Sequence, residues 1–218
     1  MIKRMIVPLI LGIGGIAILV SLGTWQLRRL EWKQDVLSEI EARIAAPPVP
    51  FAQAEGPYAP VYATGILGGP ELHVLVSRKQ IGAGYRIIQA LETEQGRIMV
   101  DRGFVPVAQV DTPRPTQTLT VTGNLHAPQD RNSSTPENDV EANIWFARDV
   151  TQMAEVLGTQ PVLLIARSDT GQGVDPMPVA TESIPNDHLQ YAMTWFSLAV
   201  VWLGMTLYLL WRIRAKTV

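Results

Sequence analysis

Two long stretches without a charged residue dominate the hydrophobic pattern of the chain. The first runs from Met5 to Leu27 and consists largely of Ile, Leu, Val, Gly and Ala. The second runs from Leu189 to Trp211, between His188 and Arg212. A helix needs about 20 apolar residues to cross a membrane, and a soluble core helix of this length would show a polar face. The pattern therefore predicts two transmembrane helices.

The first stretch has one alternative interpretation. Lys3 and Arg4 precede the apolar run, and Ser21-Leu22-Gly23 resembles a signal-peptidase cleavage site. The apolar core of a signal peptide usually has about 7 to 15 residues. The run is longer than that, which favours a transmembrane helix.

Charge is unevenly distributed around the two stretches. Five basic residues lie at the chain ends without an acidic neighbour, whereas residues 24–188 hold 13 basic and 20 acidic residues, a net charge of −7. Basic loops favour the cytoplasmic side, so we expect both termini in the cytoplasm or mitochondrial matrix. The expected segments are a cytoplasmic N-terminus (1–4), a transmembrane helix (5–25), an extracytoplasmic domain (26–188), a second transmembrane helix (189–211) and a cytoplasmic C-terminus (212–218).

The central domain changes its pattern along its length. Apolar residues recur at helical spacing from Thr24 to Ile44, which predicts an amphipathic helix that leads into the domain. Short β-branched and apolar runs then alternate with Gly and Pro, which is typical of an antiparallel sheet or partial barrel. One further helix is expected over Asp149–Leu157, with Asp149 or Thr151 as N-cap and Gly158 after its end. The expected fold is an α+β membrane protein, with two transmembrane helices flanking a β-rich domain that carries one or two helices.

The residues for most catalytic sites are missing. The chain has no cysteine, and it lacks the usual nucleophile, phosphate-loop and zinc-protease motifs. The acidic domain has no clustered basic face for nucleic acid. Gly82 and Gly84 indicate a tight turn, and Asp101-Arg102 could form an ion pair. We therefore expect neither an enzyme nor a nucleic-acid-binding protein.

His188 is the histidine that stands out, because His73 and His126 lie in predicted strands where unligated histidines are common. His188 follows Pro185-Asn186-Asp187, a plausible helix start with Asn186 as N-cap. A helix N-terminus disfavours a positive charge, so the imidazole should stay neutral and able to bind a metal.

An aromatic stripe follows His188 along the helix. At 100° per residue, Tyr191, Trp195 and Trp202 share its face, whereas Met193 points away. The stripe could hold a flat apolar ligand such as a haem, with iron on His188. The alternative, which the spacing alone favours, is that it packs against Gly12, Gly14 and Gly15 of the first apolar stretch. Both alternatives remain open.

Three motifs resemble the surfeit locus protein 1 (Surf/Shy) family of haem–copper oxidase assembly factors. Residues 22–29 read Leu-Gly-Thr-Trp-Gln-Leu-Arg-Arg, and Trp32-Lys33 follow after two further residues. Residues 100–106 read Val-Asp-Arg-Gly-Phe-Val-Pro, with Phe104 where the family usually has Trp. Residues 186–196 read Asn-Asp-His-Leu-Gln-Tyr-Ala-Met-Thr-Trp-Phe. The order of the motifs and their flanking apolar stretches extend the resemblance over nearly the whole chain.

The resemblance implies an inner-membrane protein that assists assembly of cytochrome c oxidase. It implies haem a as a transient ligand, with His188 as axial iron ligand and Tyr191 and Trp195 as further contacts. Trp25, Gln26, Arg102 and Gly103 belong to the matched motifs and are expected to be structural.

The implied partners are the largest oxidase subunit and membrane lipid, with the haem a synthase as a further candidate. In the bacterial case the central domain lies in the periplasm, and in the eukaryotic case the membrane is the mitochondrial inner membrane. The alternative function is a scaffold that stabilises the nascent subunit without binding haem. A cytochrome c oxidase and a quinol oxidase both remain possible clients.

Overall fold

The computed structural model describes residues 2–181 and 184–215, which fall into two compact units. One is helical and comprises the described residues up to Glu39 and from Ile184 onward; we call it the hairpin. The other comprises Ile40–Thr181 and contains the sheet; we call it the barrel. Each unit is described by itself.

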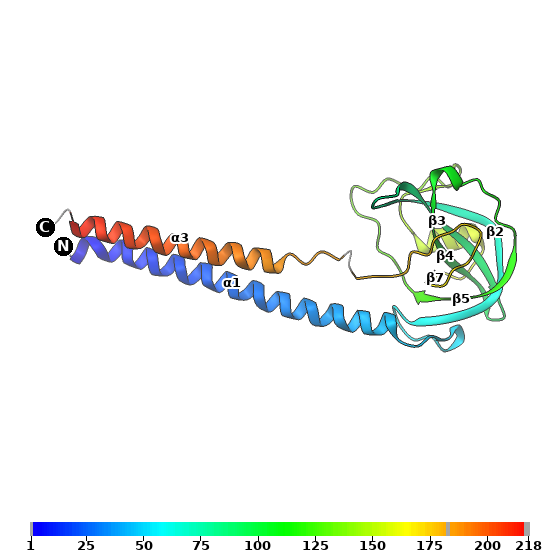
Figure 1. Cartoon of the computed structure of the whole chain (residues 1–218), viewed down its shortest axis with the longest axis horizontal. Helices are drawn as coiled ribbons and strands as arrows, with labels where there is room; N and C mark the ends of the chain where they lie inside the picture. Colours follow the sequence, from blue (N-terminus) through cyan, green and yellow to red (C-terminus); the bar gives the residue numbers. More distant parts are fainter. Residues whose placement is uncertain (1, 182–183, 216–218) are drawn as a thin grey trace. The chain divides into compact units, whose positions relative to one another are not determined.

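The hairpin consists of two antiparallel helices that lie side by side (Figure 1). They are α3 (His188–Ala215) and the part of α1 (Ile2–Ala45) that extends to Glu39. Both helices are long and apolar enough to cross a membrane. Helix α1 is continuous beyond the uncharged stretch and ends just before Pro47 and Pro48, whose rings cannot continue a helix. The expected membrane α+β fold is confirmed, with an apolar helix on each side of a sheet domain.

The barrel is a mixed sheet that closes on itself. Its main strands are β2 (Pro60–Arg78), β3 (Gly82–Thr93), β4 (Gly96–Pro106), β5 (Gln117–Leu125) and β7 (Leu163–Ala166). They pair in the order β2-β3-β4-β7-β5, and β5 pairs again with β2. Two short strands, β1 (Val49–Pro50) and β6 (Ile144–Trp145), pair with β2. The β1–β2, β2–β6 and β4–β7 pairings are parallel, a feature the alternating pattern did not predict.

Strand β2 continues through Gly68, Gly69 and Pro70, residues that usually break a strand. In the structure they form a bulge, where the register with β3 shifts between Gly68 and Glu71. Gly69 has a φ of +85° there, a conformation that glycine adopts without strain. The bulge bends β2 and keeps it paired on both sides.

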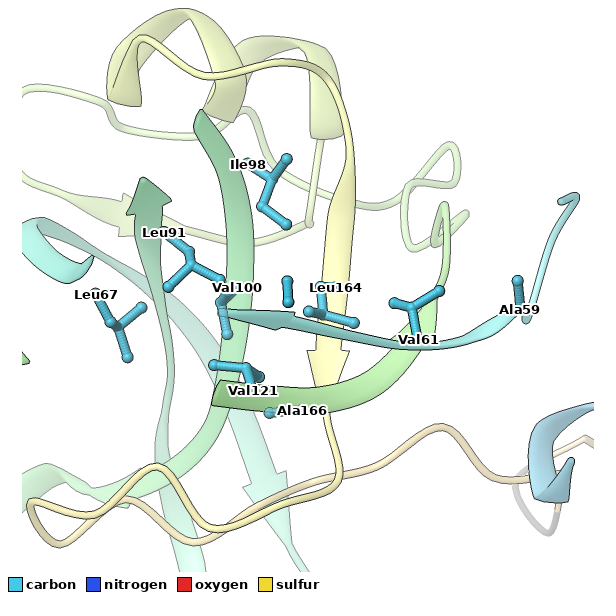
Figure 2. Close-up of a cluster of buried hydrophobic side chains, with 10 residues drawn as sticks. Ala59, Val61, Leu67, Leu91, Ile98, Val100, Val121, Leu164 and Ala166 are labelled. Carbon is cyan, nitrogen blue, oxygen red and sulfur yellow. The ribbon is translucent and has the colours of Figure 1, made fainter. Parts of the chain in front are cut away.

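Apolar side chains fill the interior of the barrel (Figure 2). All five main strands contribute to this core, which includes Val61, Leu91, Val100, Val121 and Leu164. A second buried cluster packs on the outside of β4 and β7, under helix α2 (Val150–Leu157), and includes Met99, Met153 and Ile165. Both faces of β4 and β7 are therefore covered, which explains the continuous apolar residues at 98–100 and 163–166.

Local sequence signals define α2 and the turns. The Asp149 side chain accepts a hydrogen bond from the backbone N–H of Gln152 at 3.1 Å, and Gly158 follows α2 in the left-handed conformation. The predicted cap and end of this helix are confirmed. Gly96 ends the tight turn between β3 and β4 with a φ of +113°, a conformation that glycine adopts without strain. Short 3-10 helices lie at η1 (Phe51–Gln53) and η2 (Val107–Gln109).

Candidate functional site

Glycines of α1 allow α3 to approach closely. A Cβ on Gly12 would lie 2.2 Å from the Thr206 side chain, and one on Gly15 would lie 2.3 Å from Nε1 of Trp202. Nothing lies within 4 Å of the corresponding position on Gly14. Two of the three glycines considered for packing therefore face α3, and Gly14 does not.

The aromatic stripe of α3 is turned toward α1. Nε1 of Trp202 donates a hydrogen bond to the Leu11 carbonyl at 3.4 Å. A Cβ on Gly23 would meet the Phe196 ring at 2.7 Å. The packing alternative therefore describes Trp202, which lies near the middle of α3.

His188 occupies the other end of the same stripe and contacts α1 through a polar group. Its Nδ1 lies 2.8 Å from Oε1 of Gln26, 162 residues away in the sequence. Gln26 is only 9% exposed. An amide oxygen can only accept a hydrogen bond, so Nδ1 carries the proton and Nε2 keeps its lone pair. This tautomer is the one that can bind a metal through Nε2.

Trp195 lies one heptad beyond His188 and has a buried donor without a partner. Its Nε1 makes no hydrogen bond to any described residue. Buried donors are nearly always satisfied in folded proteins, so an orphaned one needs an explanation. Trp202, whose equivalent donor is bonded to Leu11, shows that the hairpin can satisfy an indole when only packing is involved.

Tyr191 is placed differently from His188 and Trp195. Its side chain is 55% exposed, so it lies at the edge of the stripe. Its backbone N–H donates to the Asp187 carbonyl at 3.1 Å, which makes Asp187 the N-cap residue of α3. The expectation that Asn186 fills this role is wrong, and Oδ1 of Asn186 has no hydrogen-bond partner among the described residues.

A second contact ties the start of α3 to α1. Nζ of Lys33 donates a hydrogen bond to the Pro185 carbonyl. Gln26 and Lys33 belong to the motif in the first half of the chain, and Pro185 and His188 belong to the region of the last motif. The two motifs therefore meet in the hairpin. Trp25, next to Gln26, is 52% exposed and takes no part in these contacts.

An open groove follows another face of α3. It has a volume of about 620 Å³ and is lined by residues that include Gln190, Met193, Thr194 and Ser197. Met193 is 63% exposed there, consistent with its predicted direction away from His188.

Arg102 is a buried cation that binds neutral groups of the barrel. Its guanidinium donates to Oε1 of Gln89 at 2.6 Å and to Oγ1 of Thr170 at 3.1 Å. It also donates to the carbonyls of Thr170 and Gly171 and to Oε1 of Gln172. Burial lowers the pKa of Arg102 to about 10. Four of these five hydrogen bonds join β4 to the 170–172 segment, and the fifth joins it to Gln89 of β3, so the arrangement is structural.

Gly103 lets the chain pass close to a second segment. Its φ is +120°, and a Cβ would lie 2.0 Å from the Asp175 carbonyl oxygen. The neighbouring Phe104 exchanges backbone hydrogen bonds with Asp175 at 2.7 and 2.9 Å. Phe104 itself is 1% exposed, so a large apolar ring suffices where the family usually has Trp.

Asp101 belongs to a charge network that the sequence did not reveal. Its fully buried carboxylate accepts hydrogen bonds from Nη1 of Arg86 at 2.7 Å and Nη1 of Arg148 at 3.3 Å. An ion pair between Asp101 and Arg102 is not formed, since successive side chains of a strand point to opposite faces.

Arg148 continues the network to Asp130, with Nε 2.6 Å from Oδ2. Burial by itself would raise the pKa of Asp130, but its hydrogen bonds from Arg148 hold that pKa below its usual range. Burial by itself would lower the pKa of Arg148, but Asp130 and Asp101 raise it instead. The contacts between Arg148 and Asp130 therefore stabilise the charged forms of both residues.

The other two histidines have ordinary surroundings. His73 lies 3.5 Å from Oε2 of Glu71, and His126 stacks on Tyr58 at a centroid distance of 5.0 Å. Burial lowers the pKa of His126, and the positive charge of Arg148 contributes. Within residues 2–181 and 184–215, no group of three or more His, Cys, Asp or Glu side chains could hold a metal ion. This finding concerns bare metal ions, which need several protein ligands. It does not concern haem, whose iron needs only one side chain from the protein.

Comparison with known proteins identifies the family. The family model described as "SURF1 family" matches residues 14–200, which include both the Gln26 and the His188 motifs. The chain belongs to the SURF1 family. The sequence resemblance is thereby confirmed, and family membership fits a role in cytochrome oxidase assembly.

Curated relatives agree with this membership. The chain is 31% identical over 212 residues to surfeit locus protein 1 of Xenopus tropicalis, an alignment that covers 82% of this chain and 67% of the relative. It is 29% identical to the human protein of that name, over 82% of this chain and 69% of the relative. It is also 29% identical to a SURF1-like protein of Rickettsia bellii (strain RML369-C), over 92% and 88% of the two chains.

Proposed function

We propose that this member of the SURF1 family is an assembly factor for cytochrome c oxidase that holds haem a and aids its insertion into the largest subunit. His188 would hold the haem iron, and Trp195 and Tyr191 would be further contacts. The protein acts in the bacterial or mitochondrial inner membrane, with the termini on the inner side and the barrel outside. Haem a synthase is the proposed source of the ligand.

The hydrogen bond between His188 and Gln26 carries the proposal. When the imidazole donates its Nδ1 proton to Oε1 of Gln26, Nε2 keeps the lone pair that can bind iron. The neighbouring orphaned Nε1 of Trp195 supplies a donor for a polar substituent of the ligand. The residues present therefore fit a haem, which, when bound, supplies iron with an open coordination position. The apolar surroundings suit the isoprenoid tail of haem a, which would aggregate in water.

The barrel is proposed to contact the largest subunit rather than the haem. Its interior is filled by side chains of all five main strands, as is usual for barrels with few strands. The hydrogen bonds of Arg102 and the ion pairs of Asp101 are formed within the barrel and hold its loops in place. A rigid domain of this kind supports recognition of a protein client.

The test is an absorption spectrum of the full-length protein, purified in detergent from cells that make haem a. Wild type is expected to show a Soret band, and His188→Ala is expected to lose most of it. Gln190→Ala, on the groove face of α3, is the control and should keep the band. An unchanged spectrum and haem stoichiometry in His188→Ala would remove His188 as the ligand.

A second candidate function is a scaffold that stabilises the nascent subunit without binding haem. The packing of Trp202 on Gly15 favours it, because part of the stripe is used to hold α1 and α3 together. Under this alternative, His188→Ala leaves the haem a content of the oxidase intact, whereas disruption of the barrel abolishes oxidase assembly. Measuring oxidase haem a in cells with each variant separates the two functions.

A further inference from the structure

Gln26 is a buried polar side chain in the apolar part of α1. The other polar residues nearby satisfy themselves locally, as when Oγ1 of Thr24 donates to the Val20 carbonyl one turn earlier at 2.9 Å. A Gln side chain is too costly to bury in such surroundings without a partner. The described partner of Gln26 is Nδ1 of His188 on the other helix.

We infer that Gln26 is a positioning residue for His188: its amide oxygen holds the proton on Nδ1 and so presents Nε2 to the iron. The inference rests on the proposed function, because it assumes that His188 binds haem. It moves Gln26 from a structural motif residue to a part of the binding site.

The contact would act on the ligand in two ways. Nδ1 has no other partner among the described residues, so without Gln26 the ring could rotate and the proton could move to Nε2. A hydrogen bond from Nδ1–H also makes Nε2 a stronger donor to a metal. Both effects favour iron binding at Nε2.

An amide is the suitable acceptor at this position. A carboxylate would accept more strongly, but it would place a charge inside a stretch that has none from Met5 to Leu27. The amide supplies an acceptor oxygen and adds no charge. Lys33, two turns further along α1, holds the Pro185 carbonyl, so α1 fixes both the backbone before His188 and the imidazole itself.

Helix packing does not require Gln26. The contacts of Gly12, Gly15 and Gly23 with α3 involve other side chains. Leu has nearly the volume of Gln and suits an apolar helix interface. Gln26→Leu is therefore expected to keep the hairpin while removing the acceptor.

The experiment titrates haem a into the full-length protein in detergent and follows the Soret band. Gln26→Leu is expected to weaken binding about 10- to 100-fold, the usual effect of removing the partner of a metal-binding histidine. Gln26→Glu keeps an acceptor oxygen and should bind nearly as tightly as wild type. Gln190→Leu makes the same change on the groove face and should have no effect.

A spectroscopic signature separates positioning from a structural role. The iron–histidine stretching band of the reduced, haem-loaded protein, measured by resonance Raman scattering, is expected at lower wavenumber in Gln26→Leu, because Nε2 becomes a weaker donor. The band should stay at its wild-type position in Gln190→Leu and should lie at or above it in Gln26→Glu, whose carboxylate is the stronger acceptor. An unshifted band in Gln26→Leu overturns the inference.

A double variant shows whether Gln26 acts through His188. In the His188→Ala background, Gln26→Leu should cause no further loss of haem affinity. An additional loss of the same size would mean that Gln26 acts on the hairpin itself, which overturns the inference. Wild-type binding by His188→Ala overturns the proposed function as well, whereas wild-type binding by Gln26→Leu alone overturns the inference and leaves the proposed function standing.

Discussion

Arg102 in the barrel and His188 in the hairpin are both polar side chains with little exposure, yet they use their hydrogen-bonding atoms differently. Every nitrogen of the Arg102 guanidinium has a partner in the barrel. His188 uses Nδ1 and leaves Nε2 without a partner among the described residues. Trp195, on the same stripe, leaves its buried Nε1 unused.

The difference indicates which polar groups build the fold and which remain available. A fully satisfied network makes one conformation rigid and specific. An unsatisfied buried donor or acceptor is costly, so it is retained where a ligand can complete it. The barrel also has unsatisfied atoms, Nε of Arg114 and Oγ1 of Thr159. Both nitrogens at the end of Arg114 are nevertheless bonded, so its guanidinium is held in place by the barrel itself.

The largest expected effect comes from opening the barrel network. Asp101→Asn leaves Arg86 and Arg148 buried without their shared carboxylate, and removing one partner of a buried ion pair costs about 3 to 5 kcal/mol. Hydrogen-exchange mass spectrometry of β3 and β4 peptides in the full-length protein measures the loss. Asp111→Asn, in an exposed loop, is the control and should change little. Normal protection in Asp101→Asn would show that the network contributes little to the barrel.

A smaller loss is expected from the close approach at Gly103. In Gly103→Ala the alanine must adopt the positive φ of Gly103, and its Cβ would lie 2.0 Å from the Asp175 carbonyl oxygen. The 175 segment must therefore move. Gly69→Ala is a matched control, because its φ is +85° and nothing lies within 4 Å of its Cβ position. The control should cost about 1 to 2 kcal/mol for the backbone alone, and Gly103→Ala should cost clearly more in the same exchange experiment. Equal losses would mean that the contact with Asp175 is easily relieved.

Local signals in the sequence predicted much of the fold. Asp149 and Gly158 mark the ends of α2, Gly96 marks the β3–β4 turn, and the uncharged stretches mark α1 and α3. Each of these depends on residues close together in the chain. The closure of β5 onto β2 and the parallel pairing of β4 with β7 depend on distant segments, and no local pattern specifies them.

The candidate site divides in the same way. Helical spacing placed His188, Trp195 and Trp202 on one face, because that geometry is local to α3. The contact between Gln26 and His188 spans 162 residues, and the partners of Asp101 lie on other strands and loops. From the sequence, Gln26 is expected to be a structural residue of its motif, and a polar residue within the uncharged stretch can indicate that a partner exists without saying which.

The smallest expected effect is a pH dependence that belongs to the barrel. Burial lowers the pKa of His126 in the folded protein, whereas an unfolded histidine titrates near about 6.5. As the pH falls below that value, the unfolded state binds the proton first, so stability decreases on the acid side and is complete above it. His126→Phe keeps a ring that can stack on Tyr58 and cannot titrate. Exchange protection of the β5 peptide, measured between pH 7 and 5 and corrected for intrinsic exchange rates, should therefore fall less in the variant than in wild type. An equal fall in both proteins would assign the acid sensitivity to groups other than His126. The Arg148–Asp130 pair is expected to stay charged over this range and so to be as stable as it is at neutral pH.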